Sequence, residues 1–441
     1  MLAGTAKIDI TPSENVWMDG MIREHPSEGV HDPLFARALV LSNDENPASS
    51  FAVVSVDVCV LRTTEMNPLR ERLEREVSIP ASQLIVASTH THSGPATAGV
   101  LNARADAYTD GLMDKLVEVV GQAAGSLRPV QVGVGRGLED TISHYRRLLA
   151  DNGKVVMNWE PYPPEHIVGP MGEIDPDVGL LKVVGPEGEN VCLLFNHAGH
   201  PNVLSGDNYL ISAEYPGLAE RILEGKYGGM AMFFNGAQGT MDIDGLRDRD
   251  WEGMERVGKA LAGAVKEAAP SIRPVGDAQL LFGSTRYTVP ARQISDAEWQ
   301  WAQEILAETG GKLQHLADGV GDDYKALLFS RLRAVQDRPI PVMQAGFAVG
   351  RPGDEASWGA FVSFPGEMFT EIGMEIKSKS PFEHTFIIGL ANGQIGYLPT
   401  RKAIAEGGYA VSTRQTGDEA AEMVIDHSLV LLHDLHKRAV G

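Results

Sequence analysis

The feature that most constrains the fold is the run from Phe51 to Val60, which is almost continuously apolar and rich in β-branched residues. Such a run is expected for a strand that is buried on both faces of a sheet. Residues 84–88, 191–195 and 230–234 are similar apolar runs and are predicted to be further core strands. Apolar residues at helical spacing lie between them, as in residues 105–127. This alternation predicts the α/β class and leaves the order of the strands open.

Later parts of the chain are predicted to be more helical. Ser295 lies three residues before Glu298, the spacing of a capping box, and is expected to begin a helical hairpin insertion over about residues 295–336. Residues 251–269 and 416–438 are also expected to be helices.

Two segments are predicted from their Pro and Gly residues. Residues 151–176 are expected to form a long ordered loop. Glu367 follows Pro365-Gly366 and is expected to begin a helix after a strand over residues 359–364. The 441 residues fit one large or two intimately packed domains, and because no flexible linker is evident we predict one domain over residues 1–441.

Charge and hydropathy restrict the partners. The formal net charge is −21, which disfavours nucleic acid and anionic membrane surfaces. No segment has the roughly 18–20 consecutive apolar residues of a membrane span, so stable membrane insertion is not expected. The N-terminus has no export-signal pattern, and we expect a cytoplasmic protein. Cys59 and Cys192 lie in apolar runs and are expected to be buried, reduced thiols.

Two histidine motifs directly follow predicted core strands. His90-Thr91-His92 follows residues 84–88, and alternate residues of an extended chain would direct both imidazoles into one cavity. Such a pair suits a metal site or general acid–base catalysis. The segment from His197 to His200 follows the strand over residues 191–195 and could add a third imidazole. Histidines that are only hydrogen-bonded in surface loops would give the same pattern.

Two further candidate segments have simpler interpretations. Glu367 could be a carboxylate at a helix N-terminus, where the helix dipole favours it. Tyr397 and Tyr409 lie in Gly-rich segments and could be half-buried packing residues.

Together and in this order, the motifs resemble those of the neutral (non-lysosomal) ceramidase family. The matching segments are Asp9-Ile10-Thr11-Pro12, Leu34-Phe35-Ala36-Arg37-Ala38, Ser55-Val56-Asp57, His90-Thr91-His92-Ser93-Gly94-Pro95, His200-Pro201, Pro365-Gly366-Glu367 and Gly396-Tyr397 with Thr400. The resemblance spans roughly residues 3–415. It implies the family's catalytic domain, with mixed β-sheets flanked by helices.

The resemblance implies one catalytic zinc ion. Its ligands would be His90, His200, Glu367 and Tyr397. Imidazole and carboxylate ligands that leave a position for water suit catalytic zinc, whereas a phenolic ligand is unusual. Tyr397 therefore ranks below the other three.

The same resemblance implies groups that act on the substrate. His92 would stabilise the transition state, and Tyr409, twelve residues after Tyr397, would lie beside the substrate. Both could donate hydrogen bonds to a developing oxyanion. An arginine would hold the substrate, and Arg146 is the candidate, with Arg147 a close rival.

The chain departs from the family pattern in three respects. Asp242 stands where the ceramide-cleaving members have an active-site serine, with Thr240 as an alternative at that place. We expect no C-terminal immunoglobulin-like domain and no export signal. Asp242 could contact a polar or cationic part of the substrate.

These departures lead to a hypothesis of retained chemistry and a changed substrate. We expect a zinc-dependent hydrolase that cleaves an amide, lactam or ester bond of a small soluble molecule. One alternative is a ceramidase that hydrolyses N-acylsphingosine, and another is a non-catalytic protein that binds a metal or ligand. Sequence leaves open the substrate, the native metal and the oligomeric state, a homo-oligomer included.

Overall fold

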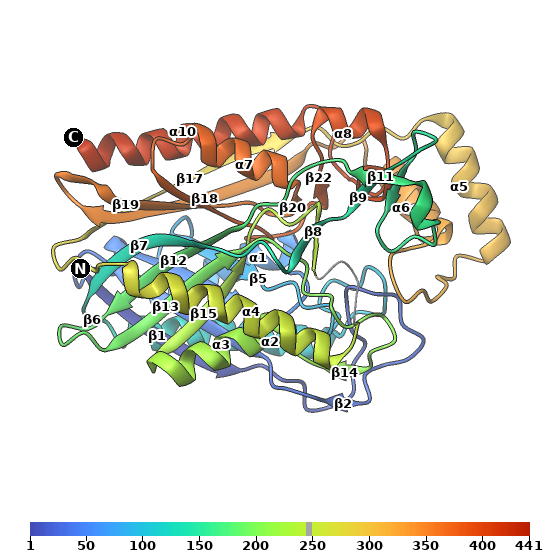
Figure 1. The fold of residues 1–441 in the computed structure, drawn as a ribbon. Helices are drawn as coiled ribbons and strands as arrows, with labels where there is room; N and C mark the ends of the chain where they lie inside the picture. Colours follow the sequence, from blue (N-terminus) through green and yellow to red (C-terminus); the bar gives the residue numbers. More distant parts are fainter. Residues whose placement is uncertain (244–248) are drawn as a thin grey trace.

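The computed structural model describes residues 1–243 and 249–441. Among these residues, three larger sheets share one apolar core, and helices cover their outer faces (Figure 1). The predicted α/β class, with mixed sheets flanked by helices, is confirmed.

The first sheet is built on the apolar run that begins at Phe51. Its strand order is β5 (Leu84–Ser88), β4 (Ser50–Val56), β3 (Phe35–Ser42), β1 (Leu2–Asp9), β6 (Arg128–Pro129). The helices α1 (Thr63–Val77) and α2 (Asp106–Ala124) pack against its outer face. Every residue of β4 and β5 is buried, as their composition predicts.

The second and third sheets have the same layered construction. The second has the order β15 (Met230–Asn235), β13 (Asn190–His197), β12 (Asp177–Val184), β7 (Gln131–Leu138), and is covered by α3 (Glu214–Tyr227) and α4 (Trp251–Ala268). The third has the order β17 (Gln279–Val289), β18 (Ile340–Arg351), β19 (Asp354–Ser363), β21 (His384–Ile388), and is covered by α7 (Thr370–Lys379) and α10 (Ala420–Val440). In Figure 1, α10 runs along the top of the third sheet, and α3 and α4 lie below the second.

Smaller elements gather at one end of the three sheets. They are the sheet β10 (Val155–Met157), β9 (Arg147–Ala150), β11 (Ile167–Pro170); the pairs β14 (Leu210–Ile211) with β2 (Gly29–Val30), β16 (Met241–Ile243) with β8 (Ser143–Tyr145), and β20 (Glu367–Met368) with β22 (Tyr397–Leu398); the helices α5 (Asp296–Thr309), α6 (Asp322–Arg333), α8 (Arg401–Glu406) and α9 (Tyr409–Ser412); and the 3-10 helix Pro164–His166, whereas the 3-10 helices Pro47–Ser49 and Ala269–Ser271 directly precede β4 and directly follow α4. Figure 1 shows β8, β9, β20, β22, α5 and α6 at this end.

Each large sheet contains a parallel pair of strands in its described part: β4 with β5, β13 with β15, and β19 with β21. The carboxyl ends of these pairs are joined to one another. Ser88 N, at the end of β5, donates to Leu390 O beyond β21, and Gly389 N donates to Asn235 O at the end of β15. Segments that follow all three pairs therefore lie close together.

The helical hairpin begins as predicted. Ser295 caps α5, its Oγ accepting from Glu298 N at 3.2 Å, and Glu298 Oε2 accepts from Ser295 N at 2.8 Å. The helix ends at Gly310, whose φ of 63° is in the left-handed region that favours glycine. The helices α5 and α6 then pack on each other around Ala302, Ala326 and Phe329.

Two local predictions are wrong. Residues 151–176 are not simply a loop, because β10 and β11 pair with the two edges of β9. Glu367 begins no helix: it lies in β20 opposite Tyr397 of β22, and α7 begins three residues later at Thr370. The backbone N–H of Glu367 donates to Gly396 O, so the segment pairs as a strand instead of coiling.

Within the described residues, no helix is long and apolar enough to cross a membrane.

The shared core depends on a group of stacked aromatic rings. Phe347 of β18 lies 4.8 Å from the ring of Phe361 and 5.4 Å from that of Phe51, and its side chain is fully buried. We predict that Phe347→Ala lowers the free energy of unfolding by about 3–5 kcal/mol, because it opens a cavity where two sheets meet. Urea denaturation would measure this. Val430→Ala, at a side chain that is 69% exposed, is the control, and an equal effect of the two substitutions would contradict the shared core.

Candidate functional site

Three of the four predicted metal ligands meet at the carboxyl ends of the parallel strands. The ligand atoms of His90, His200 and Glu367 all lie within 4.8 Å of one another, and all three side chains are buried. Glu367 Oε2 is 3.2 Å from His200 Nε2 and 3.6 Å from His90 Nε2. The structure thus brings together residues that are 277 positions apart at the extremes (367 − 90).

Each of the three follows a strand of a different large sheet. His90 lies two residues beyond β5, His200 three residues beyond β13, and Glu367 four residues beyond β19. The chain at His90 is not extended, contrary to our expectation: its φ is 75°, and its N–H donates to Val58 O. This turn, and not strand alternation, directs the imidazole toward the other ligands.

Backbone carbonyls fix the proton positions of the two imidazoles. His90 Nδ1 is 2.9 Å from Cys59 O, and His200 Nδ1 is 2.8 Å from Met241 O. A carbonyl oxygen only accepts, so Nδ1 carries a proton in each ring and Nε2, which faces Glu367, is the nitrogen that could bind a metal. Arg146 Nη1 donates to His200 Nε2 at 3.2 Å, which agrees with this tautomer.

These donors fit a metal ion. Burial lowers the pKa of His90, but Cys59 and Glu367 raise it well above its ordinary value, so without a metal a proton on this ring balances the charge of Glu367. A metal cation among the three groups would replace that proton. Imidazole nitrogens whose opposite N–H is held by a carbonyl, together with one carboxylate, form a donor set typical of catalytic zinc. Burial and then the charge of Arg146 lower the pKa of His200 to about 4, so this ring is neutral at pH 7. Burial raises the pKa of Glu367, but its contacts with His200 and His90 more than offset this and hold it well below its usual range.

Tyr397, the fourth predicted ligand, lies directly beside Glu367. The two residues are partners in the parallel pair β20–β22, and both line the same cavity. Burial raises the pKa of Tyr397 well above its ordinary value, so its phenol is protonated unless a metal lowers that pKa. Coordination by Tyr397 stays a prediction.

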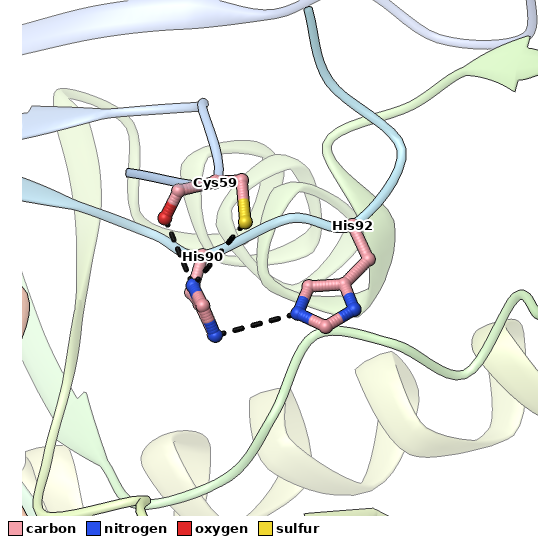
Figure 2. A group of neighbouring side chains, drawn as sticks. All are labelled: Cys59, His90 and His92. Carbon is pink, nitrogen blue, oxygen red and sulfur yellow. Dashed lines mark hydrogen bonds between the residues drawn. The ribbon is translucent and has the colours of Figure 1, made fainter. Parts of the chain in front are cut away.

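His92 contacts His90 on the cavity side. The Nε2 atoms are 3.3 Å apart, and the rings meet edge to face (Figure 2). Figure 2 also shows His90 between His92 and Cys59, whose Sγ lies 3.5 Å from His90 Nδ1. Gly20, with a φ of 88°, lies against the His92 ring, where a Cβ atom would be 2.4 Å from Cγ. Only a glycine at position 20 leaves room for this imidazole.

Of the two candidate arginines, Arg146 is the one that faces the cluster. Besides its bond to His200, its Nη2 donates to Gly239 O at 2.8 Å, and its guanidinium lies 5.3 Å from the Tyr397 ring. Arg147 is the first residue of β9 and its Nη2 contacts Glu406 Oε2 and Gly407 O instead, both at 3.1 Å. Burial lowers the pKa of Arg146, but the charges of Tyr397, Asp242 and Glu367 raise it above its ordinary value, so it stays a cation.

Tyr409 closes another wall of the cavity. Its ring centre is 5.8 Å from that of Tyr397 and 5.3 Å from that of Trp159. Burial raises the pKa of Tyr409 to about 12, which keeps its hydroxyl a hydrogen-bond donor at neutral pH.

Asp242 is not among the residues that line the cavity. It is fully buried in β16, where Oδ2 accepts from Asn158 Nδ2 at 3.3 Å and Oδ1 accepts from Ile243 N at 3.0 Å. The hydroxyl of Thr240 is likewise bonded to Thr370. Asp242 influences the site through its negative charge, which helps to raise the pKa of Arg146. Direct contact between Asp242 and the substrate stays a prediction.

The cavity also contains residues that sequence patterns did not single out as site residues. These are Asp19, Cys59, Tyr324 and Gln394, and a narrow adjoining cavity is lined by Trp159. Gln394 Nε2 donates to Glu367 Oε1 at 3.3 Å. Cys59 could have been found, because it follows β4 and the carboxyl ends of neighbouring parallel strands meet at one edge. Asp19 and Trp159 lie in irregular segments that carry no periodicity.

Comparison with known proteins identifies the family and the fold of this chain. A family model described as neutral/alkaline non-lysosomal ceramidase, N-terminal, matches residues 1–239, more than half of the chain. The chain belongs to this family. Two curated ceramidases are similar to this chain in sequence, and two solved ceramidase structures are similar to it in fold.

The two ceramidase relatives match about half of this chain. Neutral ceramidase 1 of Arabidopsis thaliana is 27% identical over 243 residues, which cover 51% of this chain and 29% of the relative. Neutral ceramidase of Pseudomonas aeruginosa is 26% identical over 230 residues, or 49% of this chain and 32% of the relative. The matched region thus spans about a third or less of each relative's length.

Solved ceramidase structures match the whole chain. The crystal structure of neutral ceramidase from Pseudomonas aeruginosa superposes with a TM-score of 0.73 at 18% identity, covering 100% of this chain and 75% of that one. A structure titled ceramidase complexed with C2 gives a TM-score of 0.75, also at 18% identity, covering 100% and 76%. These matches establish the fold.

The ligand assignment predicts a defined metal content. We expect about one zinc per chain in the wild type and almost none in the double variant His90→Ala, His200→Ala, because a single carboxylate cannot hold the ion. Mass-spectrometric metal analysis after dialysis would measure this. The exposed pair His25→Ala, His166→Ala is the control, and unchanged zinc in the first double variant would refute the assignment.

Proposed function

We propose that this protein is a zinc-dependent hydrolase that cleaves an amide bond of a small soluble substrate; related lactams and esters are also candidates. The observation that carries the proposal is the convergence of His90, His200 and Glu367, with Nδ1 of both imidazoles held by backbone carbonyls. His90 and Glu367 line a cavity together with His92 and Tyr409, and His200 lines the adjoining one. Membership of the ceramidase family supports amide hydrolysis as the reaction.

A bound zinc ion would polarise the scissile carbonyl and lower the pKa of a water molecule toward about 7. His90, His200 and Glu367 would hold the ion, with Tyr397 as the fourth ligand. Arg146, at 3.2 Å from His200 Nε2, would keep positive charge beside the carbonyl oxygen of the substrate.

His92 and Tyr409 are suited to stabilise negative charge. Burial, together with the charges of His90 and His200, lowers the pKa of His92 well below its ordinary value, so the ring is neutral and donates through one nitrogen. That N–H faces the Nε2 lone pair of His90, which a metal would occupy, leaving the donor for the substrate. Tyr409 adds a neutral hydroxyl. Two such donors aimed at an oxyanion are a large part of catalysis in acyl transfer.

The size of the cavity favours a small substrate. Its volume is about 140 Å³, below the roughly 300–1,000 Å³ of sites that enclose drug-sized ligands.

A second candidate function is hydrolysis of a long-chain ceramide. One wall of the cavity consists of Val60, Ala98, Val100 and Leu101, and Val100 is 37% exposed, so an alkyl chain could leave the cavity along it. The curated relatives are named neutral ceramidases, which also favours this reading.

A hydrolysis screen before and after chelation tests the proposal. We expect cleavage of short-chain N-acyl amides by the zinc-loaded protein, loss of activity with chelator and recovery with added zinc, because the carbonyl is not polarised without the ion. Product would be measured by chromatography. Cleavage confined to long-chain ceramides would establish the second candidate, and activity that resists complete removal of metal would contradict both.

The two neighbouring arginines provide a matched test of the substrate site. Arg146→Lys should lower kcat/KM by about 100-fold, because lysine does not reproduce the planar fork that lies beside His200. Arg147→Lys, whose side chain contacts Glu406 instead, should change kcat/KM by less than about threefold. Steady-state kinetics on the best amide of the screen would measure both, and equal losses would contradict the placement of Arg146.

A further inference from the structure

Asp19 is a buried carboxylate in the candidate active-site cavity that the proposed reaction does not use. It lies in the loop between β1 and β2 and is 2% exposed. Its backbone N–H donates to Gly94 O at 3.0 Å, its carbonyl accepts from Arg23 Nη1 at 3.1 Å, and its Oδ2 accepts from Ala98 N at 2.9 Å. Two of these bonds fix the backbone of Asp19, and the bond from Ala98 N fixes its carboxylate.

The second carboxylate oxygen, Oδ1, has no hydrogen-bond partner in the described part of the chain. Asp19 shares the cavity with His90, His92 and Glu367, yet it belongs to neither group of side chains close enough to hold a metal. It is therefore not a fifth ligand. This oxygen is not among the fully buried polar atoms and stays open to the cavity, so it can accept from a bound molecule that carries a hydrogen-bond donor.

Tyr324 presents a second free polar group to the same cavity. It comes from α6, in the helical hairpin, and among the described residues its hydroxyl makes no hydrogen bond. Burial and then the charge of Tyr409 raise the pKa of Tyr324, and Glu367 and Asp19 add to the shift, so the phenol is neutral. Two segments from distant parts of the sequence thus place an acceptor and a hydroxyl around one space beside the metal ligands.

Four of the remaining residues that line the cavity are apolar. Val60, Ala98, Val100 and Leu101 can contact the methylene groups of a short chain. A site built to accept a hydrogen bond discriminates strongly against an analogue that lacks the donor, because its polar group is then buried unpaired.

We propose that Asp19, assisted by Tyr324, forms a specificity subsite for a hydrogen-bond donor, a hydroxyl or ammonium group, that ends a short chain attached to the scissile amide. The inference rests on the proposed function and narrows its substrate class. Asp19 is a specificity-determining residue in this arrangement, since it accepts from the substrate's end group and leaves the reacting carbonyl to the metal ligands, His92 and Tyr409.

Matched substrates test the subsite. The first series consists of three acetamides whose N-substituent is pentyl, hydroxybutyl or aminobutyl. The second consists of the three corresponding N-methyl amides, in which the chain with the end group is on the acyl side of the amide bond. In one of the two series, the zinc-loaded wild type should prefer the hydroxyl or the ammonium probe to the alkyl probe by at least about tenfold in kcat/KM. Comparison of the hydroxyl probe with the ammonium probe shows which hydrogen-bond donor the subsite prefers.

Asp19→Asn keeps the acceptor for Ala98 N and removes the charge. It should lower the preference for the polar probe, measured as the ratio of kcat/KM for the polar and alkyl probes in the same protein, at least about fivefold. Tyr324→Phe removes one hydroxyl and should lower the same ratio by a smaller factor. Asp114→Asn, at a surface aspartate of α2 that pairs with Arg72, is the control for charge and should change nothing. A wild type without preference, or a preference retained in Asp19→Asn, overturns the subsite.

Binding measurements separate failure of the subsite from failure of the proposed reaction. Saturation-transfer NMR with butanol and with butylammonium should give a signal for the wild type and for Asp114→Asn, and a signal at least about fivefold weaker for Asp19→Asn. Equal signals from all three proteins overturn the subsite even if amides are cleaved. If no amide is cleaved but Asp19-dependent binding is found, the subsite holds and the proposed reaction is wrong.

Discussion

The packing of three sheets on one apolar core is the constraint on which the site depends. Because Phe51, Phe347 and the second sheet's Leu194 bury their side chains in a common interior, the sheets cannot be displaced separately. Backbone bonds such as Ser88 N to Leu390 O then tie the carboxyl ends of their parallel strands together. The side chains of His90, His200 and Glu367 lie just beyond the ends of β5, β13 and β19. The packing of the sheets therefore holds their ligand atoms within 4.8 Å of one another.

At that point the backbone also sets the chemistry of the histidines. The carbonyls of Cys59 and Met241 hold Nδ1 protons, so His90 and His200 both direct Nε2 toward Glu367. This orientation leaves two imidazole nitrogens and a carboxylate oxygen close enough to bind one cation, which is the basis for proposing a metal centre here.

Sequence predicted the parts of this architecture that depend on local composition. The apolar runs became β4, β5, β13 and β15, and the capping box at Ser295 begins a helix. Glu367 was assigned to a helix because a carboxylate after Pro-Gly fits a helix N-terminus, whereas its strand conformation depends on β22, thirty residues further along the chain (397 − 367).

Other parts of the site could not be predicted from local patterns. Arg146 and Arg147 are adjacent, and the start of β9 at Arg147 directs Arg146 toward His200 and Arg147 toward Glu406. Asp19 lies in an irregular loop, and its burial depends on contacts with Gly94 and Ala98. The family resemblance supplied the ligand residues, but only the three-dimensional structure shows which backbone atoms orient them.

X-ray absorption spectroscopy at the zinc edge of the loaded protein tests the central claim most directly. Cys59, His90 and His92 form a second group of side chains close enough to hold a metal, and it shares His90 with the first. The account predicts a first shell of nitrogen and oxygen atoms at about 2.0–2.2 Å, with multiple scattering from two imidazoles and no sulfur. A sulfur ligand at about 2.3 Å would place the ion on Cys59 and contradict the assignment to His90, His200 and Glu367.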